Sequence, residues 1–134
     1  MAIPPGPYDL DETRLVLGPT HEATPQPVTP SFYEDLGRDF ASFARHVLIS
    51  RHAFDEPWPT WEMHPHGDEF VYLISGDVDF VLRIAGRDET LRVKEPGRYV
   101  VVPKGTWHTA RPHLPTTMLF VTPGESTENR ETPG

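Results

Sequence analysis

The sequence predicts an all-β domain, and three observations support this fold class. Sixteen prolines and ten glycines are spread over 134 residues, and both residue types favour turns and short strands over helices. Residues 78–84 alternate apolar and polar side chains with the period of two that is typical of a half-buried strand. About seven to ten such short segments follow one another at even spacing, which favours a β-sandwich or barrel over βαβ units.

The strands are expected after residue 45, where turn residues separate short β-rich segments. They are predicted at residues 46–50, 61–64, 69–74, 78–84, 90–93, 99–102, 107–110 and 116–122. The Ala-Gly-Arg-Asp segment at residues 85–88 is expected to form a turn. Before this region, the pattern Ser31-x-x-Glu34 predicts one capped helical turn, which Gly37 should end.

The chain is long enough for one domain with a real core. Residues 1–30 hold seven prolines and few apolar residues, which indicates an extended N-terminal arm with one short strand. We therefore expect the arm at 1–30, the barrel at 31–124 and a polar C-terminal tail at 125–134. The strand at residues 70–74 is apolar on both faces, so its outer face should also be covered. Together with the arm, this favours a homodimer.

Composition narrows the classes of partner. The formal net charge of −8 argues against nucleic acid and against anionic lipid surfaces, both of which need clustered Lys and Arg. With no cysteine, disulfides and thiolate metal sites are excluded. The first ten residues lack the pattern of a secretory signal, and no apolar stretch approaches the roughly 20 residues that span a bilayer. The expected location is therefore the cytoplasm.

Two short segments rich in glycine and proline carry the candidate chemistry. In the first, Glu62 and His64 are two residues apart on a strand, so both side chains point to one face. After a turn at residues 65–68, Glu69 opens the next strand and can return to the same place. The second segment ends in a turn that places His108 at the start of another strand. Two imidazoles and one or two carboxylates suit one divalent ion of Fe, Mn, Ni, Zn or Cu.

The second segment resembles the second conserved motif of the cupin superfamily. It has Gly97, five residues, Pro103, one residue, Gly105, two residues and His108. It departs at the end, where Pro112 replaces the usual asparagine. The resemblance implies a double-stranded β-helix, a jelly-roll barrel with an internal pocket.

The first segment resembles the first cupin motif, His-x-His, three or four residues, Glu, six residues, Gly. Glu69 and Gly76 fit its second half. Pairing His64 with His66 leaves only two residues before Glu69, whereas pairing Glu62 with His64 leaves four, which fits. The resemblance thus implies the ligand set Glu62, His64, Glu69 and His108, with Glu62 at the position of a family histidine. The alternative, in which His66 completes the set, stays open.

Each candidate also has a purely structural interpretation. Glu62 could be a surface carboxylate, Glu69 the partner of an arginine, and the histidines hydrogen-bonded residues of the barrel mouth. Trp61 and Trp107 neighbour ligand positions on their strands, so they should point away from the pocket. No role is assigned to His21, His46, His52 and His113.

The resemblance favours a metal-dependent enzyme of the oxygenase, isomerase or lyase type that acts on a small organic molecule. The alternative is a non-catalytic cupin that binds a small ligand or assists a partner enzyme without an essential metal. No residue outside the ligand set is identified as catalytic. The sequence names neither the substrate, nor the reaction, nor the metal.

Overall fold

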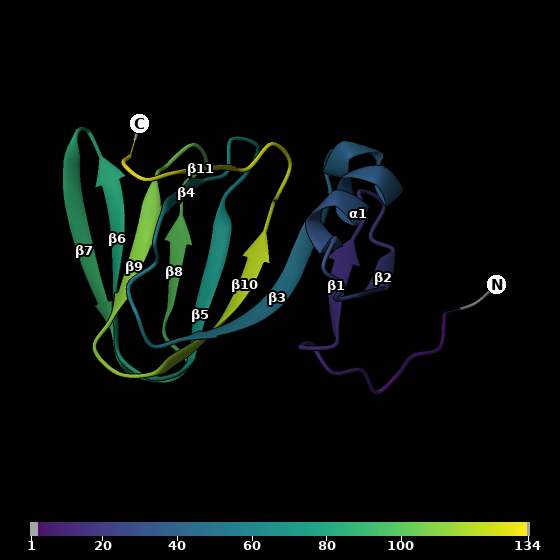
Figure 1. Ribbon diagram of the computed structural model, residues 1–134, viewed down its shortest axis with the longest axis horizontal. Coiled ribbons are helices and arrows are strands. Elements are labelled where there is room, and N and C mark those ends of the chain that lie inside the picture. Colours follow the sequence, from purple (N-terminus) through teal and green to yellow (C-terminus); the bar gives the residue numbers. More distant parts are fainter. Residues whose placement is uncertain (1–2, 134) are drawn as a thin grey trace.

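The computed structural model describes residues 3–133 and consists of two antiparallel sheets that face each other (Figure 1). The six-stranded sheet runs in the order β2 (Ala23–Pro27), β1 (Thr13–Leu17), β3 (Val47–Phe54), β10 (Thr116–Thr122), β5 (Glu69–Ser75) and β8 (Tyr99–Val102). The five-stranded sheet runs in the order β11 (Glu128–Arg130), β4 (Trp61–Met63), β9 (His108–Pro112), β6 (Val78–Ile84) and β7 (Arg87–Val93). The predicted all-β barrel is confirmed.

The core fills one end of the space between the sheets. Alternate residues of β5 and β6 point inward, among them Val71, Leu73 and Phe80, which are fully buried. Met118 of β10 closes the same cluster. Burying each such side chain contributes about 1.5–3 kcal/mol before the loss of chain entropy is counted. Because this end is packed with apolar side chains, polar inward-facing residues collect at the other end.

The N-terminal segment belongs to the six-stranded sheet. The sequence suggested an extended arm with one short strand, but residues 13–27 form the hairpin β1–β2, and β1 pairs with β3 of the same chain. Pro25 and Pro27 are compatible with β2 because this strand lies at the sheet edge, where a missing N–H group leaves no ladder bond unmade.

Helix α1 (Phe32–Asp39) is longer than the single turn that the sequence predicts. It continues past Gly37 because its apolar face is buried: Phe32 and Leu36 pack against Val16 of β1 and Leu48 of β3. This burial outweighs the roughly 1 kcal/mol that glycine costs inside a helix. Within residues 3–133, no helix is long and apolar enough to cross a membrane.

A single turn, η1 (Ala41–Phe43), connects α1 to β3. Its residues have positive φ angles, 52° at Ala41, 56° at Ser42 and 60° at Phe43, so the turn is left-handed although it contains no glycine. Such a backbone costs roughly 1–2 kcal/mol per residue. It is held in place by Phe43, whose buried ring packs edge-on against Phe40 at 6.3 Å.

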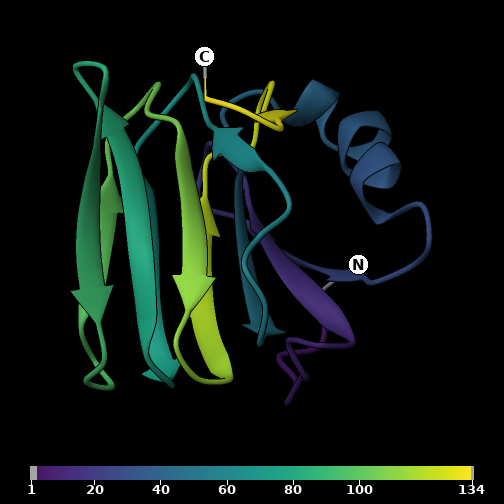
Figure 2. The same ribbon diagram turned by 60° about the vertical axis from the view of Figure 1, so that its left-hand side comes forward.

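The C-terminal segment also joins a sheet. The sequence suggested a polar C-terminal tail at 125–134, but β11 pairs with β4 in the five-stranded sheet. Figures 1 and 2 place β11 and α1 at the same end of the barrel. Helix α1 and the C-terminal segment therefore both contribute to the walls of this end.

Candidate metal centre

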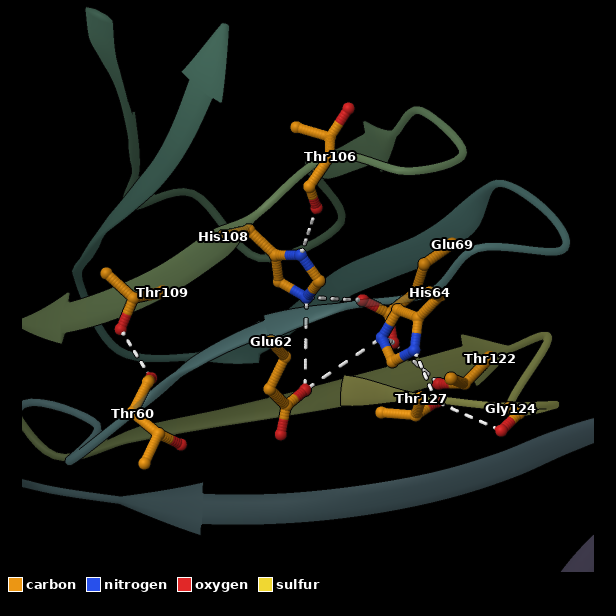
Figure 3. A network of polar contacts seen from close by, with 10 residues as sticks. All are labelled: Thr60, Glu62, His64, Glu69, Thr106, His108, Thr109, Thr122, Gly124 and Thr127. Carbon is orange, nitrogen blue, oxygen red and sulfur yellow. Dashed lines mark hydrogen bonds and ion pairs between the residues drawn. The ribbon is translucent and has the colours of Figure 1, made fainter. Parts of the chain in front are cut away.

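Three strands bring the four predicted ligands together at the polar end of the barrel. Glu62 lies on β4 and is paired in register with His108, the first residue of β9. His64 follows β4 directly, and Glu69 is the first residue of β5. In Figure 3 the four side chains point toward one another.

The loops that carry the two histidines are hydrogen-bonded to each other. The N–H of Gly105 donates to the carbonyl of His64 at 2.9 Å, and the N–H of Lys104 donates to the Asp68 carboxylate at 2.7 Å. Gly105 has a φ of +76°, a conformation that favours glycine. The predicted turn that places His108 at the start of a strand is therefore present.

The distances among the four side chains are short. Glu69 Oε2 lies 3.3 Å from His64 Nε2, and Glu69 Oε1 lies 3.2 Å from His108 Nε2. Glu62 Oε2 is 3.9 Å from both Nε2 atoms. One ligand atom from each of Glu62, His64 and His108 can be chosen so that all lie within 4.8 Å of one another. Glu69 lies beside this trio, with one oxygen on each imidazole.

Both imidazoles are held through the ring nitrogen that faces away from the cluster. His108 Nδ1 donates to the carbonyl of Thr106 at 3.0 Å. The Thr127 hydroxyl donates its proton to the carbonyl of Gly124 at 3.0 Å, so it accepts the hydrogen bond from His64 Nδ1 at 2.8 Å. Each neutral ring therefore carries its proton on Nδ1 and presents the Nε2 lone pair to the cluster, which is the arrangement of metal-binding histidines.

The Nε2 atoms of His64 and His108 and Oε1 of Glu69 are buried and, within the part of the chain that the structure describes, have no hydrogen-bond partner. Neutral imidazole nitrogens and a carboxylate oxygen all carry lone pairs. His64 Nε2 lies 3.3 Å from Glu69 Oε2 and His108 Nε2 lies 3.2 Å from Glu69 Oε1, and lone pairs at these distances repel each other unless a positive charge lies between them. That charge is a proton on an imidazole or a metal cation.

The pKa values follow this geometry. Burial raises the pKa of Glu69, but its contacts with protonated His108 and His64 outweigh burial and lower that pKa to about 2. Burial lowers the pKa of His108, but the contact with Glu69 outweighs it and raises the pKa. Burial raises the pKa of Glu62. Glu69 is also fixed by the Thr122 hydroxyl, which donates to its Oε2 at 2.6 Å. The two carboxyl groups of the centre thus have pKa values shifted in opposite directions, that of Glu69 lowered and that of Glu62 raised.

His66 does not join the cluster. Its side chain is 51% exposed, and its Nε2 lies 3.9 Å from Glu125 Oε2. Its side chain therefore lies outside the cluster, which contains Glu62 instead.

The centre opens into a cavity of about 800 Å³. Helix α1 and the turn η1 form one wall, and the inner faces of β3 and β10 form another. Trp58 lines this cavity, whereas Trp61 and Trp107 pack together with Val81 in a separate cluster, as their strand positions predicted. Sequence reasoning missed His52, which also lines the cavity. The alternation along β3 could have identified it, because residues 48, 50, 52 and 54 point to the same face of the sheet.

Comparisons with known proteins identify the fold. No family model matches the chain, and no curated protein matches it. Among solved structures, an oxalate oxidase aligns over 60% of this chain and 44% of its own, with 16% identity and a TM-score of 0.52. The oxalate decarboxylase of Bacillus subtilis aligns over 63% and 23%, with 17% identity and a TM-score of 0.53. The chain has the cupin fold.

A cupin-2 domain protein of Shewanella frigidimarina also aligns, over 63% of this chain and 71% of its own, with 18% identity and a TM-score of 0.48. The chain spans less than half the length of the two oxalate enzymes. At these identities the similarity concerns the cupin fold alone.

Proposed function

We propose that this cupin binds one divalent transition-metal ion through Glu62, His64, Glu69 and His108. The observation that carries the proposal is the group of buried, unpartnered lone pairs on His64, Glu69 and His108, which a cation would satisfy. Two nitrogens and two carboxylates form a hard-to-borderline donor set, and the second carboxylate favours Mn(II) or Fe(II). The oxalate decarboxylase of Bacillus subtilis contains Mn(II) centres, so manganese is the first ion to test.

We further propose that the metal-loaded protein is an enzyme acting on a small organic molecule in the adjoining cavity. The bound ion supplies Lewis-acid polarisation of a carbonyl or enolate oxygen, or dioxygen activation if it is iron. The chain's own residues orient the molecule and limit water: the exposed surface of the cavity walls is more apolar than polar, and polar side chains such as those of Ser50, His52 and Thr122 can orient the molecule. Thr106 and Thr127 keep both imidazoles in the tautomer that leaves Nε2 free.

The test is metal content with matched variants. We expect protein purified without an affinity tag to contain close to one transition-metal ion per chain. Glu62→Ala should lose metal, because it removes one carboxylate of the cluster, whereas His66→Ala should keep it. Metal loss in His66→Ala with retention in Glu62→Ala would overturn the ligand set.

The second candidate function is a non-catalytic cupin that binds a small ligand without an essential metal. The apolar lining of the cavity favours it, since such a pocket can hold a ligand by burial alone. A protein that is free of metal as purified, is not stabilised by added Mn(II) or Fe(II), and still binds organic molecules would favour this function over the enzyme.

We also propose that the chain forms a homodimer through the outer face of the six-stranded sheet. There Tyr99 and Val101 are 60% and 52% exposed, and the Tyr99 ring packs 4.9 Å from that of Phe70. Light scattering after size-exclusion chromatography should give twice the chain mass for the wild type and the chain mass for Val101→Asp. A monomeric wild type would refute the proposal.

A further inference from the structure

The cavity wall beyond the metal ligands is aromatic. Five rings line it: Tyr33, Phe43, Phe54, Trp58 and Phe120. Trp58 lies at the centre, with its ring 5.6 Å from Phe54 and 5.9 Å from Phe120. Its ring also lies 6.4 Å from that of His108, so the aromatic wall begins beside the metal centre. Aromatic surfaces in this arrangement pack against flat ring systems in offset or edge-on geometry.

His52 contributes a polar side chain to this wall. His52 lies on the inner face of β3, with its ring 5.5 Å from Phe120 in an edge-on contact. Among residues 3–133, no protein group hydrogen-bonds its imidazole, although the residue is more than half buried and lines the cavity. Burial lowers the pKa of His52, so the ring is neutral near pH 7, with one nitrogen that donates and one that accepts.

The distance between His52 and the metal centre sets the length of a molecule that could touch both. β10 lies between β3 and β5, and His52 pairs with Met118 whereas Phe70, next to Glu69, pairs with Val121. His52 and Glu69 are therefore two strands apart, about 10 Å across the sheet, and about four residues, roughly 13 Å, apart along it. A molecule that touches both the metal centre and His52 must cross the ring of Phe120. A two-carbon acid at the metal centre would reach neither His52 nor most of the aromatic wall, and a cavity of about 800 Å³ would stay largely unfilled.

We propose that the cavity takes a ring-bearing organic molecule with two polar groups, one at the metal centre and the other hydrogen-bonded to His52. This inference rests on the proposed metal-binding function and narrows its substrate class. It makes His52 the residue that selects the far end of the ligand. The aromatic wall then selects for the ring between the two polar ends.

The experiment uses three neutral probes of similar size. Phenol has the ring and one polar group, cyclohexanol has the polar group without an aromatic ring, and 4-hydroxybenzamide has the ring with a second polar group opposite the first. Binding is measured by calorimetry on zinc-loaded and metal-free wild type, with metal content determined on the same samples. Quenching of the Trp58 fluorescence, lost in Trp58→Phe, reports whether the probe enters the cavity.

We expect phenol to bind at least fivefold more tightly than cyclohexanol, and 4-hydroxybenzamide about tenfold more tightly than phenol, as one additional hydrogen bond allows. His52→Gln keeps a donor and an acceptor and should retain this tenfold gain. His52→Leu should bind phenol as the wild type does but lose the gain.

Two results would overturn the inference: cyclohexanol binding as tightly as phenol, or a tenfold gain that persists in His52→Leu. The metal content separates this failure from that of the proposed function. Normal metal binding without the gain refutes the ring-bearing ligand alone. If 4-hydroxybenzamide still binds about tenfold more tightly than phenol in a protein that binds no metal, only the metal site is refuted. The placement of the ligand's first polar group at that site is then refuted with it.

Discussion

His64 and His108 present the same nitrogen to the same point, but different parts of the chain hold them. His108 is anchored locally, since its Nδ1 donates to the carbonyl of Thr106, two residues earlier. His64 is anchored at long range, because its Nδ1 donates to Thr127, 63 residues further along the chain. One half of the candidate centre is therefore built by a single loop, and the other requires the folded C-terminal segment.

This difference makes the metal centre depend on the tail. Strand β11 pairs with β4 and thereby fixes Thr127 beside His64. Ser126 and Asn129 of the same segment also line the cavity. Fraying of the tail would release one imidazole and open the cavity, while the loop of His108 would keep its local anchor. The two histidines should thus respond differently to changes in the tail.

Truncation should expose the difference most strongly. Removing residues 125–134 deletes both Thr127 and β11, so His64 loses its anchor and its strand loses a neighbour. We expect Zn(II) affinity to fall about 100-fold, the upper range for loss of supporting contacts around a ligand. Competition titration with a chromogenic chelator measures the affinity, and circular dichroism checks the fold.

The matched control removes only residues 131–134, which leaves Thr127 and β11 intact. This shorter truncation should bind Zn(II) like the full chain. Equal affinities of the two truncated proteins would show that the tail does not support His64.

The pH dependence should differ in sign between metal-free and metal-loaded protein. In the metal-free protein the pKa of His108 is higher in the folded chain than its unfolded value of 6.5. The protonated ring therefore stabilises the fold fully below pH 6.5, and this contribution is lost as pH rises through the folded pKa. Metal binding requires the deprotonated ring, so affinity should fall by up to tenfold per unit below that folded value.

Urea unfolding between pH 6 and 9, with and without Zn(II), measures both effects. We expect the free energy of unfolding to decrease with pH in the metal-free protein and to increase with pH when metal is present. In Glu69→Gln, which removes the charge that raises the pKa of His108, the metal-free decrease should flatten. Parallel curves in the presence and absence of metal would argue against a metal at this site.

A single hydroxyl tests the long-range anchor alone. Thr127→Val keeps the shape of the side chain but removes the acceptor for His64 Nδ1. We expect about tenfold weaker Zn(II) binding, while Thr127→Ser should bind as the wild type does. No such substitution exists for His108, because its partner is a backbone carbonyl. Unchanged affinity in Thr127→Val would mean that both rings are oriented by their loops.

The contrast between the two histidines also explains what could be predicted from the sequence. The strand periodicities are local patterns and predicted the all-β fold. The resemblance to the two cupin motifs, also local in sequence, implied the set Glu62, His64, Glu69 and His108, which the structure brings together. Thr127 could not be found in this way, because nothing in residues 125–134 indicates which strand they join. That pairing depends on which sheet edge the barrel leaves open beside β4.

His52 and the N-terminal hairpin were missed for related reasons. The prolines of β2 argue against a strand unless its edge position is known, and that position is a property of the assembled sheet. His52 has no metal-ligand spacing to other histidines. Its importance arises only because β3 turns it into the cavity.

The glycines of the two loops give the smallest expected effects. A Cβ on Gly67, in the loop of His64, would lie 2.8 Å from Cγ of Pro123, so Gly67→Ala must displace the start of the tail and should destabilise the protein by about 2 kcal/mol. A Cβ on Gly105, in the loop of His108, would meet no atom within 4 Å, but its φ of +76° is strained for alanine. Gly105→Ala should therefore cost only about 1 kcal/mol.

The two substitutions should differ in their effect on the centre as well as in size. Gly67→Ala disturbs the segment that leads to Thr127, so it should weaken Zn(II) binding together with stability. Gly105→Ala raises only a local backbone energy, and Gly105→Asn, which tolerates positive φ better, should recover part of it. Urea unfolding and Zn(II) titration of the three variants decide the matter. If Gly105→Ala weakened metal binding more than Gly67→Ala, the loop of His108 rather than the tail would be the sensitive side of the centre.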